Sequence, residues 1–461
     1  MPTGAERMDI TIIGAGFSGT LTAVHLVRAR SDIRVTLVER SGRFGPGLAY
    51  STPDPSHLLN VPAGNMSAFD DQPSHFLDWA RSADPSIHTG SFVRRSLYGE
   101  YIRSVLDAAR SAHPDRIRLC HDEALRGRWD NGSWHVELRS GEALTSAALV
   151  LALGNTPPQP PPGADVRVFG HAGYVSNPWN VERLRAIDAG ASVLLIGAGL
   201  TMVDAVLTLR DRGHTGPMTA ISRHGVAPRT HRSPSKPPVG RRPPEALDRW
   251  DGSALGMLRI LRAAVADGAA AGADWREAVN SIRTITPQLW SRMAETERSR
   301  FLRRLRSYWE VVRHRAAPEI GALIADLMAA RRLKIRPARL ESLAPAGAKL
   351  EARFRPRGSE QVQRMIVDAA INCLGPDTDL SRSADPLTRQ LLDSGIVRTD
   401  ALRLGLLADP EGRPLGADGR PVPGMIIVGP WRRAQHWEAT AVPELRKQTL
   451  RAAGLLAGPS R

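Results

Sequence analysis

The sequence predicts an α/β fold with parallel sheets, made of two Rossmann-like domains and a helical insertion. Two observations carry this prediction: strand and helix patterns alternate along the chain, and the order strand, glycine turn, helix, strand occurs twice. The 461 residues exceed one ordinary hydrophobic core and suit two domains. We expect one domain to comprise residues 1–160 plus 365–461, and the other to comprise residues 161–364 with the insertion at about 240–332.

The composition is ordinary for a globular protein, with 42% hydrophobic and 24% charged residues. No apolar run approaches the roughly 20 residues that a membrane helix needs, and the polar N-terminus leads directly into a strand. We therefore expect a cytoplasmic protein without a membrane partner. The two cysteines, Cys120 and Cys373, are too few and too far apart for a disulfide framework, a CxxC redox pair or a cysteine-rich metal site.

The net charge of +15 allows two interpretations. An arginine-rich chain that binds anionic cofactors is the interpretation we favour. The alternative is a nucleic-acid partner, gripped by basic residues of the proline-rich segment 228–244. Those residues are Arg229, Arg232, Lys236, Arg241 and Arg242. No zinc-finger spacing or aromatic-and-basic RNA-binding pattern supports this alternative.

The first glycine unit has the full pattern of a dinucleotide-binding turn. A short strand at 9–13 leads into GAGFSG, where Gly14 permits the sharp turn, Gly16 lets the backbone approach a pyrophosphate, and Gly19 lets the helix pack closely on the strand. The next strand ends at Glu39, where a carboxylate can accept both ribose hydroxyls. This acid suits FAD, whose AMP half has free ribose hydroxyls.

Between the two glycine units the sequence predicts a functional loop, a hairpin and a linker. Residues 45–69 are a long loop of mixed composition, which is typical of functional segments. Asn131-Gly132 predicts a hairpin turn within residues 129–151. The proline-rich segment 155–162 then predicts a stiff connection to the second domain.

The second glycine unit predicts NADPH rather than NADH. Met202 replaces the third glycine, which loosens helix packing but keeps the phosphate turn. The strand that follows ends at Ser222-Arg223, where a hydroxyl and a guanidinium would hold a 2′-phosphate that an acid would repel. Alternatively, Arg223 is a solvated residue at a strand end. The residues expected to hold the nicotinamide cofactor are Gly197, Gly199, Leu200, Thr201, Ser222 and Arg223.

Residues 246–332 are almost wholly helical in pattern. A central helix at 297–315 would place Phe301, Tyr308 and Trp309 on one face, and we expect this stripe to be core rather than a flavin cage. Further strands are predicted at 367–374 and 425–428, and a last helix at about 441–455.

Several segments together resemble the bacterial FAD–NAD(P)-binding family, whose relatives include flavin-dependent N-hydroxylating monooxygenases. They are GAGFSG, GPGLAYST, HLLNVPAGNMSAF, FVRRSLYGEYI, IGAGLTMVDAVLTL, SYWEVVRHRAAPEI and GPWRRAQHWEATAVPELRKQ, and they span residues 9 to about 453. The resemblance implies an FAD site, a flavin-side loop and a helix start that faces the flavin pyrimidine. Its residues would be Gly14, Gly16, Phe17, Ser18, Gly19, Glu39, Arg40, Tyr50, Leu59, Asn60, Val61, Gly154, Gly429, Pro430, Thr440, Ala441 and Val442.

The helix start also has a physical reason, because a helix N-terminus stabilises the negative charge that develops on a reduced flavin. Its alternative is an ordinary C-terminal helix with Pro443 in the first turn.

The catalytic candidates are Asn60, Arg313 and His314, and each has a structural alternative. Asn60 would position substrate beside the flavin, or simply form a turn. Arg313, His314 and Arg315 would hold an anionic substrate or the nicotinamide ribose, or complement a helix C-terminus. Arg94 and Arg95 would bind an anion or form surface ion pairs.

These observations predict an NADPH-dependent FAD monooxygenase that uses oxygen to hydroxylate a small, polar, anionic, nitrogen-containing molecule. Two alternatives stay open: an NADPH oxidoreductase that passes electrons to a quinone or another acceptor without activating oxygen, and a basic flavoprotein associated with nucleic acid. We expect no metal site. The sequence does not indicate the oligomeric state.

Overall fold

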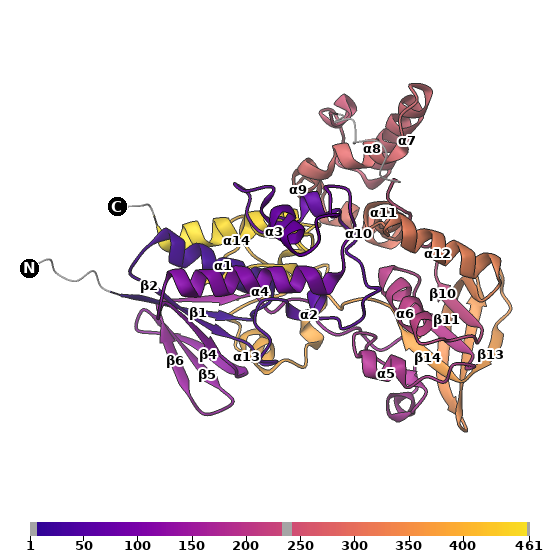
Figure 1. The fold of residues 1–461 in the computed structure, drawn as a ribbon, viewed down its shortest axis with the longest axis horizontal. Coiled ribbons are helices and arrows are strands. Elements are labelled where there is room, and N and C mark those ends of the chain that lie inside the picture. The colour runs from indigo at the N-terminus through magenta and orange to yellow at the C-terminus, as the bar shows by residue number, and fades with distance from the viewer. Residues whose placement is uncertain (1–6, 233–241, 459–461) are drawn as a thin grey trace, which may run out of the picture.

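The computed structural model describes residues 7–232 and 242–458. Figure 1 shows two sheets at opposite ends of the molecule, with a group of helices standing above the second one. The α/β class with parallel sheets is confirmed. Lys236 and Arg241, two of the basic residues considered for nucleic-acid binding, lie outside the described residues.

The first sheet is wholly parallel, in the order β15-β7-β1-β2-β3. Its short strands are nearly all apolar, as expected for strands covered on both faces. The strand from the C-terminal part of the chain joins this sheet, as predicted. The bounds are β1 Met8–Ile13, β2 Ile33–Val38, β3 Ile117–Cys120, β7 Ala148–Leu151 and β15 Met425–Ile427.

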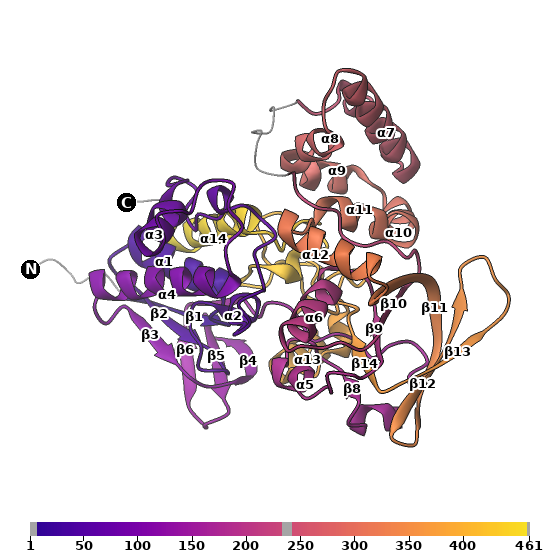
Figure 2. The same cartoon turned by 45° about the vertical axis from the view of Figure 1, so that its right-hand side comes forward.

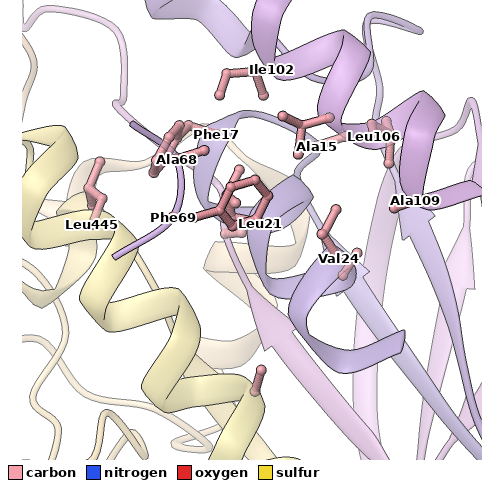
Figure 3. Packing of buried hydrophobic residues seen from close by; sticks show 14 of the residues in the cluster. Ala15, Phe17, Leu21, Val24, Ala68, Phe69, Ile102, Leu106, Ala109 and Leu445 are labelled. Atoms are coloured by element: carbon pink, nitrogen blue, oxygen red, sulfur yellow. The ribbon is translucent and has the colours of Figure 1, made fainter. Parts of the chain in front are cut away.

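Helices cover one face of this sheet. Figure 3 shows Phe17, Leu21, Phe69, Ile102 and Leu445 converging between the helices and the sheet. Each is 6% exposed or less, and burying a side chain of this size contributes about 2 kcal/mol. This core holds the first glycine turn rigidly against its neighbours. The helices on and around this face are α1 Phe17–Ala29, α2 Gly47–Tyr50, α3 His75–Ala83, α4 Arg95–Ala112 and α14 Val442–Ala457.

An antiparallel meander and one helix cover the other face. The meander consists of β4 Ala124–Asp130, β5 Ser133–Leu138 and β6 Ala143–Ser146. Asn131 and Gly132 both have positive φ, at 48° and 79°, which confirms the predicted hairpin turn. The helix is α13 Pro386–Asp393.

The second sheet has the order β13-β12-β11-β10-β9-β14-β8, parallel from β11 to β8 and extended by an antiparallel hairpin. Helices α5 Val181–Arg185 and α6 Leu200–Asp211 accompany it. The bounds are β8 Tyr174–Val175, β9 Val193–Ile196, β10 Met218–Ser222, β11 Leu333–Ala346, β12 Lys349–Pro356, β13 Gln363–Val367 and β14 Ala369–Asn372.

The chain returns to the first domain later than residue 365, where the sequence analysis placed the boundary. Strand β14 pairs in parallel with β9, Ala370 opposite Leu194, and therefore belongs to the second sheet. The predicted strand at 367–374 was right, but its apolar pattern fits either sheet equally well. The boundary falls after Asn372.

The expected helical insertion is present, and Figure 2 shows its first helices standing furthest from both sheets. Helix α12 packs on the second sheet through Ile324 and Leu327, whereas the preceding helices share a core with Leu404 and Trp437 of the C-terminal region. The insertion therefore bridges the two domains. Its helices are α7 Ala254–Ala270, α8 Trp275–Ser281, α9 Thr286–Arg292, α10 Glu295–Arg304, α11 Arg306–Arg313 and α12 Pro318–Ala329.

The predicted continuous helix at 297–315 is wrong, because it is divided at Leu305 into α10 and α11. The division separates the aromatic stripe. Phe301 packs edge-on against Trp437, and the Trp309 indole donates to Glu438 at 3.2 Å. Tyr308 points elsewhere: it is 39% exposed and lies against His224. The core interpretation therefore holds for Phe301 and Trp309 and fails for Tyr308.

Two connecting segments run side by side between the domains. Thr156 and Gln159 of the outgoing segment both donate to Asp377 of the returning one, and Asn372 donates to the Gln159 carbonyl at 2.7 Å. Within the described ranges, no helix is long and apolar enough to cross a membrane.

Candidate cofactor and substrate site

A long pocket opens where the strands of the first sheet end. Four parallel strands deliver residues there: Gly14 follows β1, Glu39 follows β2, Gly154 follows β7 and Gly429 follows β15. Ligands of open parallel sheets bind at this edge. The expected FAD residues that line the pocket are Gly14, Gly16, Phe17, Ser18, Glu39, Arg40, Tyr50, Gly154, Pro430 and Thr440.

The glycines of the first turn are required by close backbone contacts. A Cβ on Gly14, whose φ is +98°, would lie 2.4 Å from the Ala152 carbonyl oxygen. A Cβ on Gly19 would lie 1.9 Å from the Gly14 carbonyl oxygen, so α1 can approach β1 only without a side chain there. Gly429 lies against Ser18, with a Cβ position 3.2 Å from its hydroxyl. The C-terminal segment therefore closes on the first glycine turn.

Glu39 ties the end of β2 to the glycine turn. Its Oε2 accepts the Ala15 N–H at 3.0 Å, and Oε1 accepts the Ser41 N–H and hydroxyl at 2.9 and 2.8 Å. A carboxylate has about four acceptor positions, so one remains for a ligand hydroxyl. Arg40 lies at the pocket rim and pairs loosely with Asp385 at 3.5 Å.

A second cavity of about 930 Å³ adjoins this pocket. Tyr50 and Thr440 line both, so the two spaces are continuous. One wall is the loop 59–66 of the first domain, and the opposite wall comes from α8 and the end of α11. The expected site residues Leu59, Asn60, Val61, Thr440, Ala441, Val442, Arg313 and His314 all line it.

Five arginines line this cavity, and four of them have carboxylate partners. Arg313 pairs with Glu438 at 2.9 Å, and Arg283 pairs with Glu444 through two of its guanidinium nitrogens, at 2.9 and 3.1 Å. Glu444 belongs to the first turn of α14, so this pair fixes the helix start at the cavity. Arg232 pairs with Glu277 at 3.0 Å, and Arg276 with Asp274 at 2.9 Å.

Arg315, the fifth arginine, has no carboxylate partner among the described residues. It is 3% exposed and donates to the Val312 carbonyl at 2.7 Å and to the Asn280 amide oxygen at 2.9 Å. Burial, followed by the charges of Arg276 and Arg313, lowers its pKa to about 10, so it stays cationic at neutral pH. A buried guanidinium that contacts no carboxylate directly favours an anionic ligand.

Asn60 joins the loop to the insertion through its backbone. Its carbonyl oxygen lies 2.9 Å from His231 Nε2, and its side-chain amide lines the cavity without a hydrogen bond to another described residue. His314 also lines the cavity, and burial lowers its pKa, so the imidazole is neutral at neutral pH. Burial raises the pKa of Tyr50 to about 12 and keeps this phenol protonated.

The second glycine turn is open. Gly199 is exposed, with no atom within 4 Å of a Cβ position, and it precedes the first turn of α6, where Leu200 and Thr201 present unpaired N–H groups. A Cβ on Gly197 would lie 2.4 Å from the Cys373 carbonyl oxygen, which repeats the relation of Gly14 to Ala152. This repetition supports equivalent roles for the two turns.

Basic groups gather at the end of β10. Ser222 caps its own turn by accepting the Gly225 N–H at 3.1 Å, and Arg223 is exposed and unpaired within the described part of the chain. Arg357, from the turn after β12, donates to the Tyr308 hydroxyl at 3.3 Å. The Tyr308 ring contacts the ring of His224. Burial, followed by the positive charges of Arg357 and Arg223, lowers the pKa of His224.

Some candidates have structural partners that narrow their roles. Arg313 is held by the buried Glu438, so Arg315 is the better placed of the two for an anionic ligand. Arg95 is an ion-pair residue, bound to Asp204 of α6. Arg232, considered for nucleic acid, lines the cavity instead. Both cysteines are buried and free, and no group of metal-ligand residues occurs in the part of the chain that the structure describes.

Four cavity residues were not predicted from the sequence: Arg276, Asn280, Arg283 and His231. Arg276 and Asn280 belong to α8, Arg283 to the turn after it, and His231 to an irregular segment. No spacing in the sequence connects these residues with the loop 59–66. Polar residues occur near both ends of α8, around Ala278-Val279, and this ordinary pattern does not mark Arg276 or Asn280 as cavity residues.

Comparison with known proteins agrees with this geometry. A family model described as FAD-NAD(P)-binding matches residues 11–156. The chain is 14% identical to a Kutzneria ornithine N-hydroxylase structure, with a TM-score of 0.67 over 98% of this chain and 99% of that one. The expected resemblance to the FAD–NAD(P)-binding family is therefore confirmed over the first glycine unit, and the two-domain α/β fold is shared over nearly the whole chain.

Two curated relatives match parts of the chain. An L-aspartate N-monooxygenase (nitrosuccinate-forming) of Streptomyces davaonensis is 27% identical over 350 residues, which cover 61% of this chain and 52% of that protein. An uncharacterized protein of Escherichia coli K12 is 22% identical over 222 residues, which cover 43% of this chain and 39% of that protein. The matches thus span about half or less of the relatives' length.

Proposed function

We propose that this chain binds FAD in the first pocket and NADPH at the second glycine turn, and that it N-hydroxylates a small anionic amine in the arginine-lined cavity. The observation that carries the proposal is the cavity itself. It is continuous with the FAD pocket through Tyr50 and Thr440, and it contains the buried Arg315, which forms no ion pair with a carboxylate of the described residues. The relative that acts on aspartate, an anionic amine, supports the same substrate class.

The residues present fit FAD. Gly14 and Gly16 leave backbone free to meet a pyrophosphate at the start of α1, and Glu39 keeps acceptor capacity for a ribose hydroxyl. The start of α14 lies at the cavity wall, where its N–H groups would favour negative charge on the flavin. Bound FAD would supply the redox chemistry between NADPH and oxygen.

The protein's own side chains would bind and orient the substrate and NADPH, and exclude water from the cavity. Arg315 would hold a substrate carboxylate, and the wall formed by loop 59–66 would place the substrate beside the flavin. Arg223 and Arg357 would hold the 2′-phosphate of NADPH. The neutral His314 and Asn60 offer hydrogen bonds without adding charge.

The test measures products from FAD-loaded protein supplied with NADPH and oxygen. Amines of different charge are compared: aspartate and glutamate, ornithine and lysine, and cadaverine. The proposal expects oxygenated nitrogen products from the anionic amines, and only peroxide with the cationic ones. Oxygenation of cationic amines alone, or NADPH oxidation that depends on an added quinone and yields no oxygenated product, would refute it.

A further inference from the structure

His231 occupies the boundary between the insertion and the flavin-side loop. Its backbone N–H donates to the Ala316 carbonyl at 2.9 Å, which anchors it beside α12. Its ring contacts Phe92, with centroids 5.0 Å apart, and lies on the cavity wall. Nε2 lies 2.9 Å from the Asn60 carbonyl oxygen.

This last contact determines the tautomer of the neutral ring. A carbonyl oxygen only accepts hydrogen bonds, so Nε2 must carry the hydrogen and donate it. Nδ1 then carries a lone pair. No hydrogen bond from another described residue reaches it. His231 therefore presents a hydrogen-bond acceptor in a cavity whose arginines can only donate.

The charged groups around His231 keep it neutral before substrate binds. Burial, followed by Arg315, Arg276 and Arg313, lowers its pKa to about 4, while the bond to Asn60 acts in the opposite direction. Arg232, the next residue in sequence, forms ion pairs with Asp274 and Glu277, and Arg276 forms an ion pair with Asp274. From the first domain the ring meets the uncharged Phe92 and Asn60. A substrate carboxylate bound at Arg315 would offset this positive field and raise the pKa of His231.

The chemistry of the proposed reaction requires an acceptor of this kind. An ammonium nitrogen has no lone pair, so a protonated amine must lose a proton before its nitrogen can be oxygenated. We propose that Nδ1 of His231 binds the substrate amine and accepts that proton: an N–H bond of the ammonium breaks, its electron pair stays on nitrogen, and a new N–H bond forms on Nδ1. The proton then passes to water. The inference rests on the proposed function and assigns the amine end of the substrate to Asn60 and His231, and its carboxylate end to Arg315.

The substitution His231→Gln separates the acceptor from the anchor. Glutamine can still donate to the Asn60 carbonyl but has no basic nitrogen. With aspartate as the probe, we expect the rate of oxygenated product formation to fall about 100-fold, as for loss of a general base, with more of the NADPH oxidation yielding peroxide. The rate at which NADPH reduces the flavin should stay within about twofold, because none of the described residues of the second glycine turn lines the cavity that contains His231.

The pH profile is the second readout. Product formation by His231→Gln should rise about tenfold per pH unit up to the pKa of the amine, whereas the native enzyme should level off at lower pH. His25→Gln is the matched control, since His25 lies outside the cavity with a buried Nε2, and burial also lowers its pKa to about 4. The control should keep the native profile.

The outcomes are distinguishable. A His231→Gln enzyme with native coupling and native pH profile would overturn the inference and leave the proposed function intact. An equal fall in flavin reduction and product formation would also overturn it, because it would show a structural role. A native enzyme that oxygenates no amine would overturn the proposed function, and this inference with it.

Discussion

Arg95 of α4 and Asp204 of α6 form a two-point ion pair across the junction of the two domains. The distances are 2.7 Å from Nη1 to Oδ2 and 3.0 Å from Nη2 to Oδ1. Beside this pair, His57 lies 3.0 Å from the Thr208 hydroxyl, and Thr208 donates to Asp54 at 2.7 Å. Both contacts also join the first domain to α6. The junction is therefore held by specific polar contacts.

Arg95→Ala should destabilise the protein by about 2–3 kcal/mol, because it leaves Asp204 unpaired at a largely buried position. Chemical denaturation of Arg95→Ala, Asp204→Ala and the double variant measures the coupling between the two residues. We expect a coupling free energy above about 1 kcal/mol. Strictly additive losses would show that the pair contributes nothing to holding the domains.

Arg223→Ala should lower kcat/KM for NADPH by tenfold or more and leave NADH unchanged. The reason is that a charge-assisted hydrogen bond to the 2′-phosphate contributes about 1.5–3 kcal/mol. Arg357→Ala should act in the same direction, since both guanidiniums lie beside His224. Steady-state kinetics with both coenzymes checks this, and an unaltered coenzyme preference would contradict the placement.

Arg315→Met should raise KM for an anionic amine by about 10- to 100-fold, because it removes a charge-assisted bond from a buried site. The flavin reduction rate should not change. The control is Arg262→Met, at an exposed arginine of α7. Equal KM values for both variants and the native enzyme would exclude Arg315 as the carboxylate site.

Stability should fall as pH decreases from about 6.5 to 4. His25, His231 and His436 have folded pKa values of about 4 because of burial, below their unfolded value of about 6.5. Protons therefore bind the unfolded chain first, and each residue disfavours folding as pH falls through this window by up to a few kcal/mol. Denaturation at pH 7.5 and pH 5 measures the loss. His25→Leu should reduce it, and a pH-independent stability would contradict the buried, neutral histidines.

The first glycine unit was predictable because each step is local. A short apolar strand, three glycines and a strand-end acid all lie between residues 9 and 39, and the contacts of Gly14 and Gly19 show why other residues do not fit. The division at Leu305 was not predictable, because helical periodicity continues through it and tertiary contacts separate Trp309 from Tyr308. The boundary near residue 372 was missed for the same reason, because the sequence of β14 does not indicate that it pairs with β9.

The arrangement of the cavity residues was the part of the structure that the sequence predicted least. Arg315 and Asn60 were singled out from sequence, but neither their proximity nor the role of His231 between them could be deduced. The link is a hydrogen bond between residues 171 positions apart. Arg313 and Arg315 look alike in sequence, but among the described residues only Arg313 forms an ion pair with a carboxylate, that of Glu438.

The central claim is that two dinucleotide sites cooperate in one chain, and the most direct measurement is anaerobic reduction of the FAD-loaded protein by NADPH in a stopped-flow spectrometer. We expect a yellow protein whose flavin absorbance is bleached by NADPH faster than by NADH. A protein that stays colourless after incubation with FAD, or a bound flavin that neither coenzyme reduces, would contradict it.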